Sequence, residues 1–131
     1  MAEPVVWVRI DVVLAIHRRQ LAEHGGSDGL RDAGLLASAL DRPRNLAAYA
    51  DPAPDLATLA AAYAAGVARN HPFIDGNKRA AFVICRTFLI LNGFDVTASR
   101  ENKYATFLSL ASGELADEQL AAWIRQHLVA V

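Results

Sequence analysis

The densest group of reactive side chains lies at positions 70–79, which read NHPFIDGNKR. His71 can accept a proton from a hydroxyl group that attacks phosphorus. Asp75 offers an oxygen ligand of the kind that Mg²⁺ prefers, and Mg²⁺ usually accompanies nucleotide phosphates. Lys78 and Arg79 are cations that can neutralise phosphate oxygens. A base, a metal ligand and two cations so close together indicate phosphoryl or nucleotidyl transfer.

The backbone of this stretch is also suited to an anion site. Pro72 disfavours helical geometry at His71, so we expect a helix to end there. Gly76 allows a sharp turn and the close approach of a ligand. Asn77 is a good N-cap, which predicts that a second helix starts there and that the two following cations oppose its dipole. A bound polyanion would remove that conflict. The alternative is a polar interhelical turn, in which His71 is merely structural.

Two apolar segments of helix length flank the motif, at residues 56–68 and 80–91. Each is apolar on nearly every face, which predicts two buried helices. Arg69 follows the first segment directly. There it can stabilise the C-terminus of the helix or help bind phosphate. Because the chain as a whole predicts about six helices, this pair included, and no sustained strand alternation, we expect an all-α bundle around the central pair.

The N-terminal half holds the elements that must support the motif. A β-prone run at residues 5–8 forms an edge segment or leads directly into a helix that starts at Ile10 and ends at Gly25 and Gly26. We interpret His17, on the inner stripe of that helix, as a core histidine rather than a catalytic one. Arg31 can reach phosphate or brace the loop, and we favour bracing.

Asp32 is a plausible N-cap for a short helix that Pro43 should stop. Residues 44–55 then form an irregular segment that we expect to be a mobile lip of the site, and Asp55 caps the first buried helix. Beyond the second buried helix, Asn92 and Gly93 form a C-cap and residues 95–97 an extended link.

The last two predicted helices follow this link. Ser99 caps a helix that runs to Gly113, and Asp117 caps the final helix. Trp123 and His127 are interpreted as packing and surface residues.

Composition limits the classes of function. The chain has 131 residues, a hydrophobic content of 53% and a formal net charge of −1, which predicts one core-rich domain spanning 1–131. That balance gives no basic footprint for direct nucleic-acid binding. Cys85 is the single cysteine, so no disulfide forms within the chain. Residues 1–4 lack the start of a signal peptide, and Arg86 interrupts the longest apolar run, so we expect a cytosolic protein without a membrane span.

The segment HPFIDGNKR resembles the motif of the Fic/Doc family, and Lys78, where typical Fic enzymes have glycine, resembles the Doc (death-on-curing) branch. Residues 29–36, 38–40 with 42–43, 91–94 and 111–115 look like Doc segments in the same order. The resemblance implies a Fic/Doc-like helical fold with the motif between two central helices.

The resemblance also implies a role for each motif residue. It makes His71 the general base, Asp75 the Mg²⁺ ligand and Phe73 a buried anchor of the loop. The phosphate-binding residues that it implies are Gly76, Asn77, Lys78 and Arg79, with Arg69 as a further candidate.

The implied activity is that of a toxin in a bacterial type II toxin–antitoxin pair. Such a toxin is a protein kinase that transfers the γ-phosphate of ATP to a threonine of elongation factor Tu and blocks translation. A small antitoxin binds such a toxin and inhibits it. The alternatives are Fic-type transfer of AMP to a protein hydroxyl, because Pro72 and Gly76 are shared with typical Fic motifs, and a module that binds nucleotide or antitoxin without catalysis.

Overall fold

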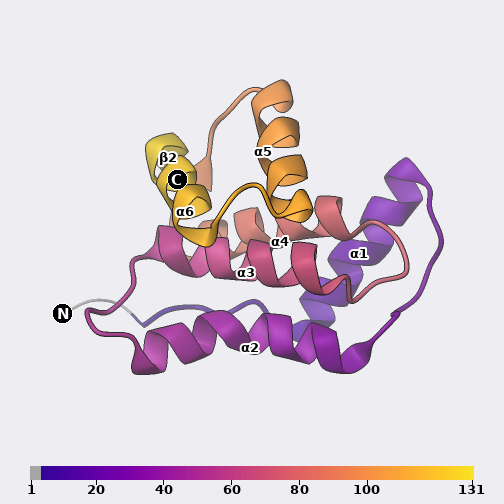
Figure 1. Ribbon diagram of the computed structural model, residues 1–131, viewed down its shortest axis with the longest axis horizontal. Helices are drawn as coiled ribbons and strands as arrows, with labels where there is room; N and C mark the ends of the chain where they lie inside the picture. Colours follow the sequence, from indigo (N-terminus) through magenta and orange to yellow (C-terminus); the bar gives the residue numbers. More distant parts are fainter. Residues whose placement is uncertain (1–3) are drawn as a thin grey trace.

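Six helices and a small two-stranded sheet make up the computed structural model, which describes residues 4–131. The helices are α1 (Ile10–His24), α2 (Ala33–Tyr49), α3 (Leu56–Asn70), α4 (Asn77–Leu91), α5 (Arg100–Ser112) and α6 (Asp117–His127) (Figure 1). Strands β1 (Phe94–Val96) and β2 (Leu128–Ala130) pair antiparallel. The predicted all-α bundle is therefore confirmed. Part of the signal-peptide prediction falls on residues 1–3, which lie outside the described residues.

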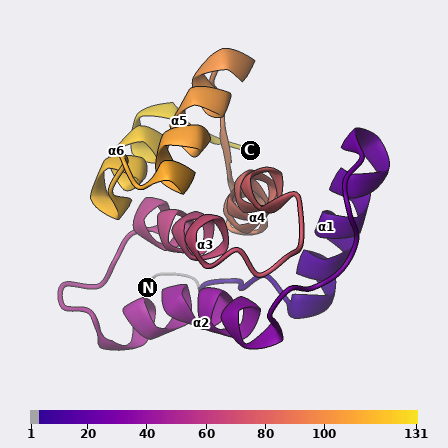
Figure 2. The same cartoon turned by 45° about the vertical axis from the view of Figure 1, so that its right-hand side comes forward.

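Helix α3 runs through the middle of the molecule, with α2 on one side and α5 and α6 on the other (Figures 1 and 2). All of its side chains from Leu59 to Ala68 are buried. Most of these residues are alanine, which allows neighbouring helices to approach closely. One close approach is at Gly66, where an added Cβ would lie 3.0 Å from the Cα of Ala39 on α2.

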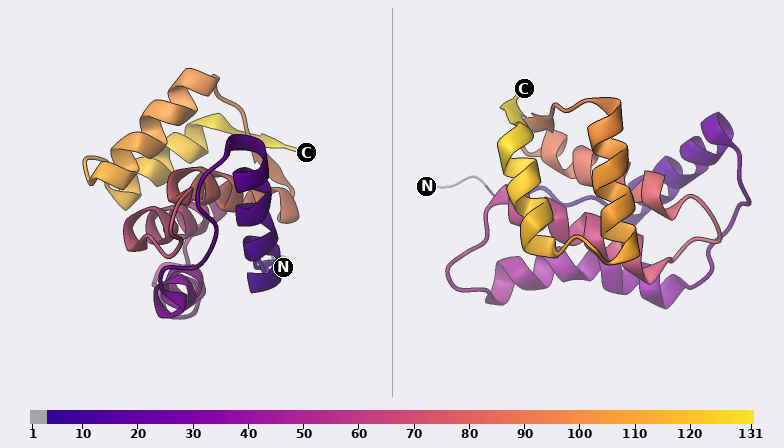
Figure 3. Two further views of the ribbon diagram at one scale, coloured as in Figure 1. Left: turned by 90° about the vertical axis from the view of Figure 1, so that its right-hand side faces the viewer. Right: turned by 45° about the horizontal axis from the view of Figure 1, so that its top comes forward.

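Helix α4 is the second buried helix and packs along α3. Phe88 and Tyr63 are fully buried, with ring centroids 5.1 Å apart. Burial raises the pKa of the neighbouring Cys85 thiol to about 12, which makes it an unreactive core residue. Both predicted central helices are confirmed, and Figure 3 shows α5 and α6 stacked over them with α2 on the opposite side.

The N-terminal run leads into α1 and forms no strand within the described residues. Its backbone is held by side chains instead: the Val8 N–H donates to the Tyr63 hydroxyl at 3.1 Å. Val6 exchanges two hydrogen bonds of 2.9 Å with the amide of Asn92. These bonds satisfy backbone groups that a sheet would otherwise pair.

The prediction that Pro43 stops its helix was wrong. Helix α2 continues through Pro43 to Tyr49, so the irregular segment before α3 is shorter than the predicted lip. Proline inside a helix costs roughly 3 kcal/mol because it removes a hydrogen bond and crowds the preceding turn. Leu46 and Ala47, one turn further on, pack against the core and offset that cost.

Two predicted N-caps are displaced by one residue. Gly76 occupies the cap of α4 and Asn77 is its first residue, while Ala116 precedes α6 and Asp117 opens it. The caps at Asp32, Asp55 and Ser99 are confirmed, because each side chain accepts a backbone N–H in the first turn. No helix among residues 4–131 is both long enough and apolar enough to cross a bilayer.

Candidate active site

His71 follows the last residue of α3 and has a left-handed backbone, with φ 49° and ψ 56°. A residue with a side chain is strained in this conformation, at roughly 1–3 kcal/mol, so neighbouring contacts must hold it. Arg31 provides them: its guanidinium donates to the carbonyls of His71 and Asn70, each at 2.7 Å. The N–H groups of Arg31 and Asp32 also donate to the Pro72 carbonyl. Arg31 thus braces the loop, as predicted.

The loop between α3 and α4, residues 71–76, is called the motif loop below. It is anchored from the inside by Phe73, which is 1% exposed. Its ring stacks on the buried imidazole of His17, with centroids 3.8 Å apart and an interplanar angle of 7°. The Nε2 of His17 lies 2.7 Å from the carbonyl oxygen of Asp75. His17 is thus a core residue, as predicted, and Phe73 is buried where the resemblance implies an anchor of the loop.

Asn77 closes the loop from the helix side and is itself buried. Its side-chain oxygen accepts the Phe73 N–H at 3.0 Å, and its Nδ2 donates to the Phe73 carbonyl at 2.9 Å. The same Nδ2 lies 3.4 Å from Nδ1 of His71. That contact is long for a hydrogen bond, so it orients the ring without fixing which nitrogen carries the proton.

The Asp75 carboxylate is exposed at the turn before α4. One oxygen accepts the N–H of Gly76 at 2.8 Å, and the other lies 3.3 Å from the N–H of Ser27. Gly76 has φ 78°, which favours glycine, although an added Cβ would meet no atom closer than 3.6 Å. The turn therefore requires glycine for its conformation, and not for space.

A cavity of about 830 Å³ opens beside the motif loop. It is within the size range of small-ligand sites. The residues that line it come from α1, the motif loop, α4 and α5: Gln20, His24, His71, Ile74, Asp75, Gly76, Asn77, Lys78, Arg79, Phe82, Val83, Arg100, Lys103, Tyr104, Phe107 and Leu108. All of the predicted catalytic, metal and phosphate residues of the motif therefore lie together, with Phe73 beneath them.

The lining of this cavity is strongly cationic in a chain whose net charge is −1. Lys78, Arg79, Arg100 and Lys103 face a single carboxylate, that of Asp75. Within residues 4–131 none of the four cations forms an ion pair. Clustered cations without partners repel one another, so a polyanion would be stabilised here.

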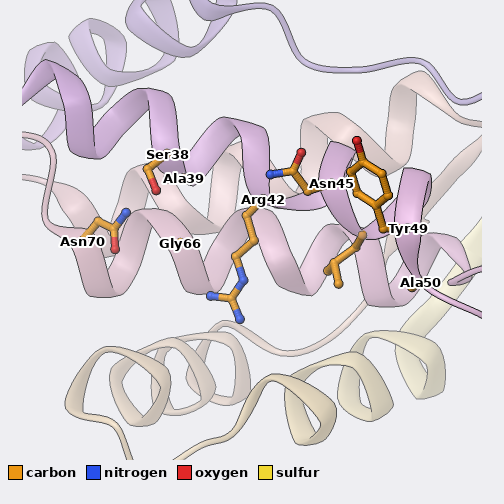
Figure 4. A pocket seen from close by; sticks show the side chains of 9 residues that line it. Ser38, Ala39, Arg42, Asn45, Tyr49, Ala50, Gly66 and Asn70 are labelled. Carbon is orange, nitrogen blue, oxygen red and sulfur yellow. The ribbon is translucent and has the colours of Figure 1, made fainter.

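Arg69 does not line this cavity. Its guanidinium pairs with the carboxylate of Asp117 and donates to the Leu115 carbonyl at 2.8 Å. Arg42 of α2 pairs with the same carboxylate, and Figure 4 shows its side chain reaching past α3 toward the C-terminal helices. Arg69 thus connects α3 to the start of α6, a role that the sequence did not indicate.

A second cavity of about 600 Å³ lies along α2 and α3, with Ser38, Asn45 and Tyr49 of α2 and Gly66 of α3 in its lining (Figure 4). Arg42 is the one cation in its lining, and Asp117 already neutralises it. This cavity contains no base and no free cation among the described residues, so it lacks the means for phosphoryl transfer.

Sequence reasoning missed the α5 wall of the first cavity. Arg100, Lys103 and Tyr104 are spaced at i, i+3 and i+4, which places them on one face of α5. That spacing was visible in the sequence. What it could not show is that this face turns toward a motif more than twenty residues away in the chain.

The cavity offers few protein ligands for Mg²⁺. Asp75 is the only carboxylate in the cavity, and no group of three or more possible ligands exists within residues 4–131. Mg²⁺ is commonly held by one or two carboxylates together with phosphate oxygens and water. Asp75 therefore fits a metal that arrives with a nucleotide, but not a metal bound by the protein alone.

The helical fold places His71 at the junction between two buried helices and two cations in the first turn of the second helix, and this arrangement agrees with the family found by comparison. The chain belongs to the Fic/DOC family, whose model matches residues 7–89. It is also 43% identical over 74 residues to "Toxin Doc" of Mycolicibacterium smegmatis (strain ATCC 700084 / mc(2)155), a match that places it on the Doc branch. That match covers 56% of this chain and 57% of the relative.

Proposed function

We propose that this protein is the toxin of a toxin–antitoxin pair and a protein kinase that acts in the bacterial cytoplasm. Its substrates would be ATP and a threonine hydroxyl of elongation factor Tu, and a cognate antitoxin would hold it silent. One observation carries the proposal: His71, Asp75, Lys78 and Arg79 all line one cavity. Membership of the Fic/DOC family and similarity to a relative named as a toxin support it.

The chemistry follows from these positions. His71 accepts the proton of the threonine hydroxyl while the hydroxyl oxygen forms a bond to the γ-phosphorus. The bond between that phosphorus and the bridging oxygen breaks, and ADP leaves. Lys78 and Arg79 neutralise charge on the phosphates as it moves to the leaving group. Asp75 would hold Mg²⁺, which supplies further neutralisation of the phosphate oxygens when bound.

Lys78 favours transfer of the γ-phosphate over transfer of AMP. Its side chain is exposed in the cavity and fills space that glycine would leave open for phosphates in the Fic manner. AMP transfer is the second candidate, because Pro72 and Gly76 are those of typical Fic motifs. In both reactions His71 activates the hydroxyl, so the difference lies in which phosphorus is presented to it.

The two reactions are separated by the position of the label in ATP. The purified protein is incubated with elongation factor Tu, Mg²⁺ and ATP labelled at either the α- or the γ-phosphate. We expect γ-label on elongation factor Tu and none with His71→Ala. α-Label on the target would replace the kinase proposal with AMP transfer. No label on this or any lysate protein, with His71→Ala indistinguishable from the parent, would leave a binding module.

A further inference from the structure

The wall of the active-site cavity that faces the motif loop is formed by α5. Arg100, Lys103 and Tyr104 line it, followed by Phe107 and Leu108. Arg100 and Tyr104 are exposed, with 67% of Tyr104 accessible, while Lys103 is partly buried. This face carries cations at one end and an aromatic ring beside them.

The charge of this wall is not explained by the fold. Seven of the thirteen lysines and arginines form no ion pair within the described residues, and four of these seven line this one cavity. Asp95 attracts Lys103 electrostatically but forms no ion pair with it. The Asp95 carboxylate is instead bound by Arg86, at 2.8 and 3.0 Å. The cations of α5 are therefore available to a ligand.

The position of these cations is also unfavourable for α5 itself. Arg100 is the first residue of the helix and Lys103 the fourth, where positive charge opposes the helix dipole. Lys103 has one stabilising contact, with its ammonium group 5.3 Å from the centre of the Phe82 ring. A residue that weakens its helix and lines a cavity is more readily explained by a ligand than by folding.

We propose that α5 forms the second half of the nucleotide site. Arg100 and Lys103 bind phosphate oxygens from the side opposite Lys78 and Arg79, and the exposed ring of Tyr104 stacks on the base. The cavity volume of about 830 Å³ accommodates one nucleoside triphosphate between the two walls. Aromatic rings at the edge of such a site stack on bases without requiring a particular one. This inference rests on the proposed function, since both place ATP in the same cavity.

The test is a binding measurement that does not depend on transfer. Calorimetric titration with Mg²⁺ and ATP is carried out on His71→Ala protein, without any protein substrate. In this background, Arg100→Gln with Lys103→Gln should weaken ATP binding roughly tenfold or more and should flatten its dependence on salt. Tyr104→Ala should weaken binding of ATP but not of tripolyphosphate, which has no base.

The matched control is Arg18→Gln, which removes an exposed arginine of α1 that has no ion pair and lies outside the cavity. It should leave ATP binding unchanged, and melting temperatures should show that every variant is folded. Equal ATP affinity in the His71→Ala protein with and without Arg100→Gln and Lys103→Gln would overturn the α5 proposal and leave the proposed kinase intact. The same change made in protein that retains His71 gives a second readout: a raised KM for elongation factor Tu with unchanged ATP affinity would also overturn the proposal, because it would make α5 a docking surface for protein.

The converse outcome is also distinguishable. ATP binding that depends on α5, combined with no transfer of label to any protein, would support the nucleotide site and remove the proposed reaction. A parent protein that binds no ATP at saturating Mg²⁺ would overturn both.

Discussion

Two residues outside the motif hold its backbone in place. Arg31 donates to two backbone carbonyls at the end of α3, and His17 contacts the Asp75 carbonyl beneath the turn. Neither needs to touch a substrate to affect the reaction. Because transfer requires the reacting atoms to be placed within a fraction of an ångström, such positioning residues strongly affect turnover.

Replacing Arg31 with lysine tests this role. Lysine keeps the charge but cannot donate to two carbonyls in the fixed geometry of a guanidinium. We expect kcat to fall roughly tenfold to a hundredfold, with little change in KM for ATP, because Arg31 does not line the cavity. Steady-state kinetics would measure both constants. A rise in KM with unchanged kcat would instead indicate that Arg31 binds the nucleotide.

Asp75→Asn separates the metal role from the structural role of that side chain. Asparagine keeps an oxygen that can accept the Gly76 N–H, so we expect the melting temperature to change little. Transfer should fall roughly tenfold or more, and higher Mg²⁺ should recover part of it, because a neutral oxygen is a poorer ligand. Parallel loss of melting temperature and activity would show that Asp75 is needed for folding.

At the scale of elements, the site depends on how closely α2 approaches α3. Helix α3 supplies the residues that end at His71, and α2 follows directly from the loop that contains Arg31. They approach closely at Gly66, where an added Cβ would lie 3.0 Å from the Cα of Ala39. Any change in this spacing moves Arg31 relative to the carbonyls that it binds.

Gly66→Ala should therefore destabilise the protein although alanine favours helices. The gain in helix propensity is about 1 kcal/mol, whereas forcing a methyl group against the backbone of Ala39 costs about 1–3 kcal/mol. Thermal unfolding should show a lower melting temperature, and adding Ala39→Gly should recover part of the loss. A stabilised Gly66→Ala protein would contradict the packing described here.

Local patterns predicted most elements, because they rest on short-range chemistry. The apolar runs around the motif became α3 and α4, and the caps at Asp32, Asp55 and Ser99 lie where side-chain chemistry places them. Errors arose where distant contacts decide the outcome. Burial beyond Pro43 extended α2 to Tyr49, and β2 forms only because it pairs with β1.

The same division holds for the site. Its motif residues are consecutive, so their types and spacing indicated their chemistry. The α5 wall is assembled by tertiary packing, and Arg69 is withdrawn from the cavity by Asp117, which lies 48 residues further along the chain. A local sequence pattern can predict neither that α5 faces the cavity nor that Arg69 pairs with Asp117.

At the scale of the whole molecule, ion pairs connect α6 to the rest of the bundle. Asp117 pairs with arginines of α2 and α3, and Arg125 binds the Asp55 carboxylate at 2.8 Å. The hydrogen bond from Arg125 is the main cause that lowers the pKa of Asp55 from 3.8 to about 2. A carboxylate with a lowered pKa stabilises the folded state only while it is ionised.

The lowered pKa of Asp55 predicts how stability depends on pH. The contribution of Asp55 is fully present above pH 4 and is lost as the pH falls toward 2. Both side chains are about half exposed, so solvent screening keeps the pair below about 1 kcal/mol. Urea unfolding of the parent and Arg125→Gln should show a difference at pH 7 that shrinks below pH 4. A difference that grows in acid would rule out this pair as the cause.

The left-handed backbone at His71 carries a last consequence. Glycine adopts this geometry freely, so His71→Gly should be more stable than His71→Ala, by about 1 kcal/mol, when their melting temperatures are compared. His71 thus has a side chain at a position where the backbone favours glycine, which is expected if its imidazole is needed for the proposed reaction.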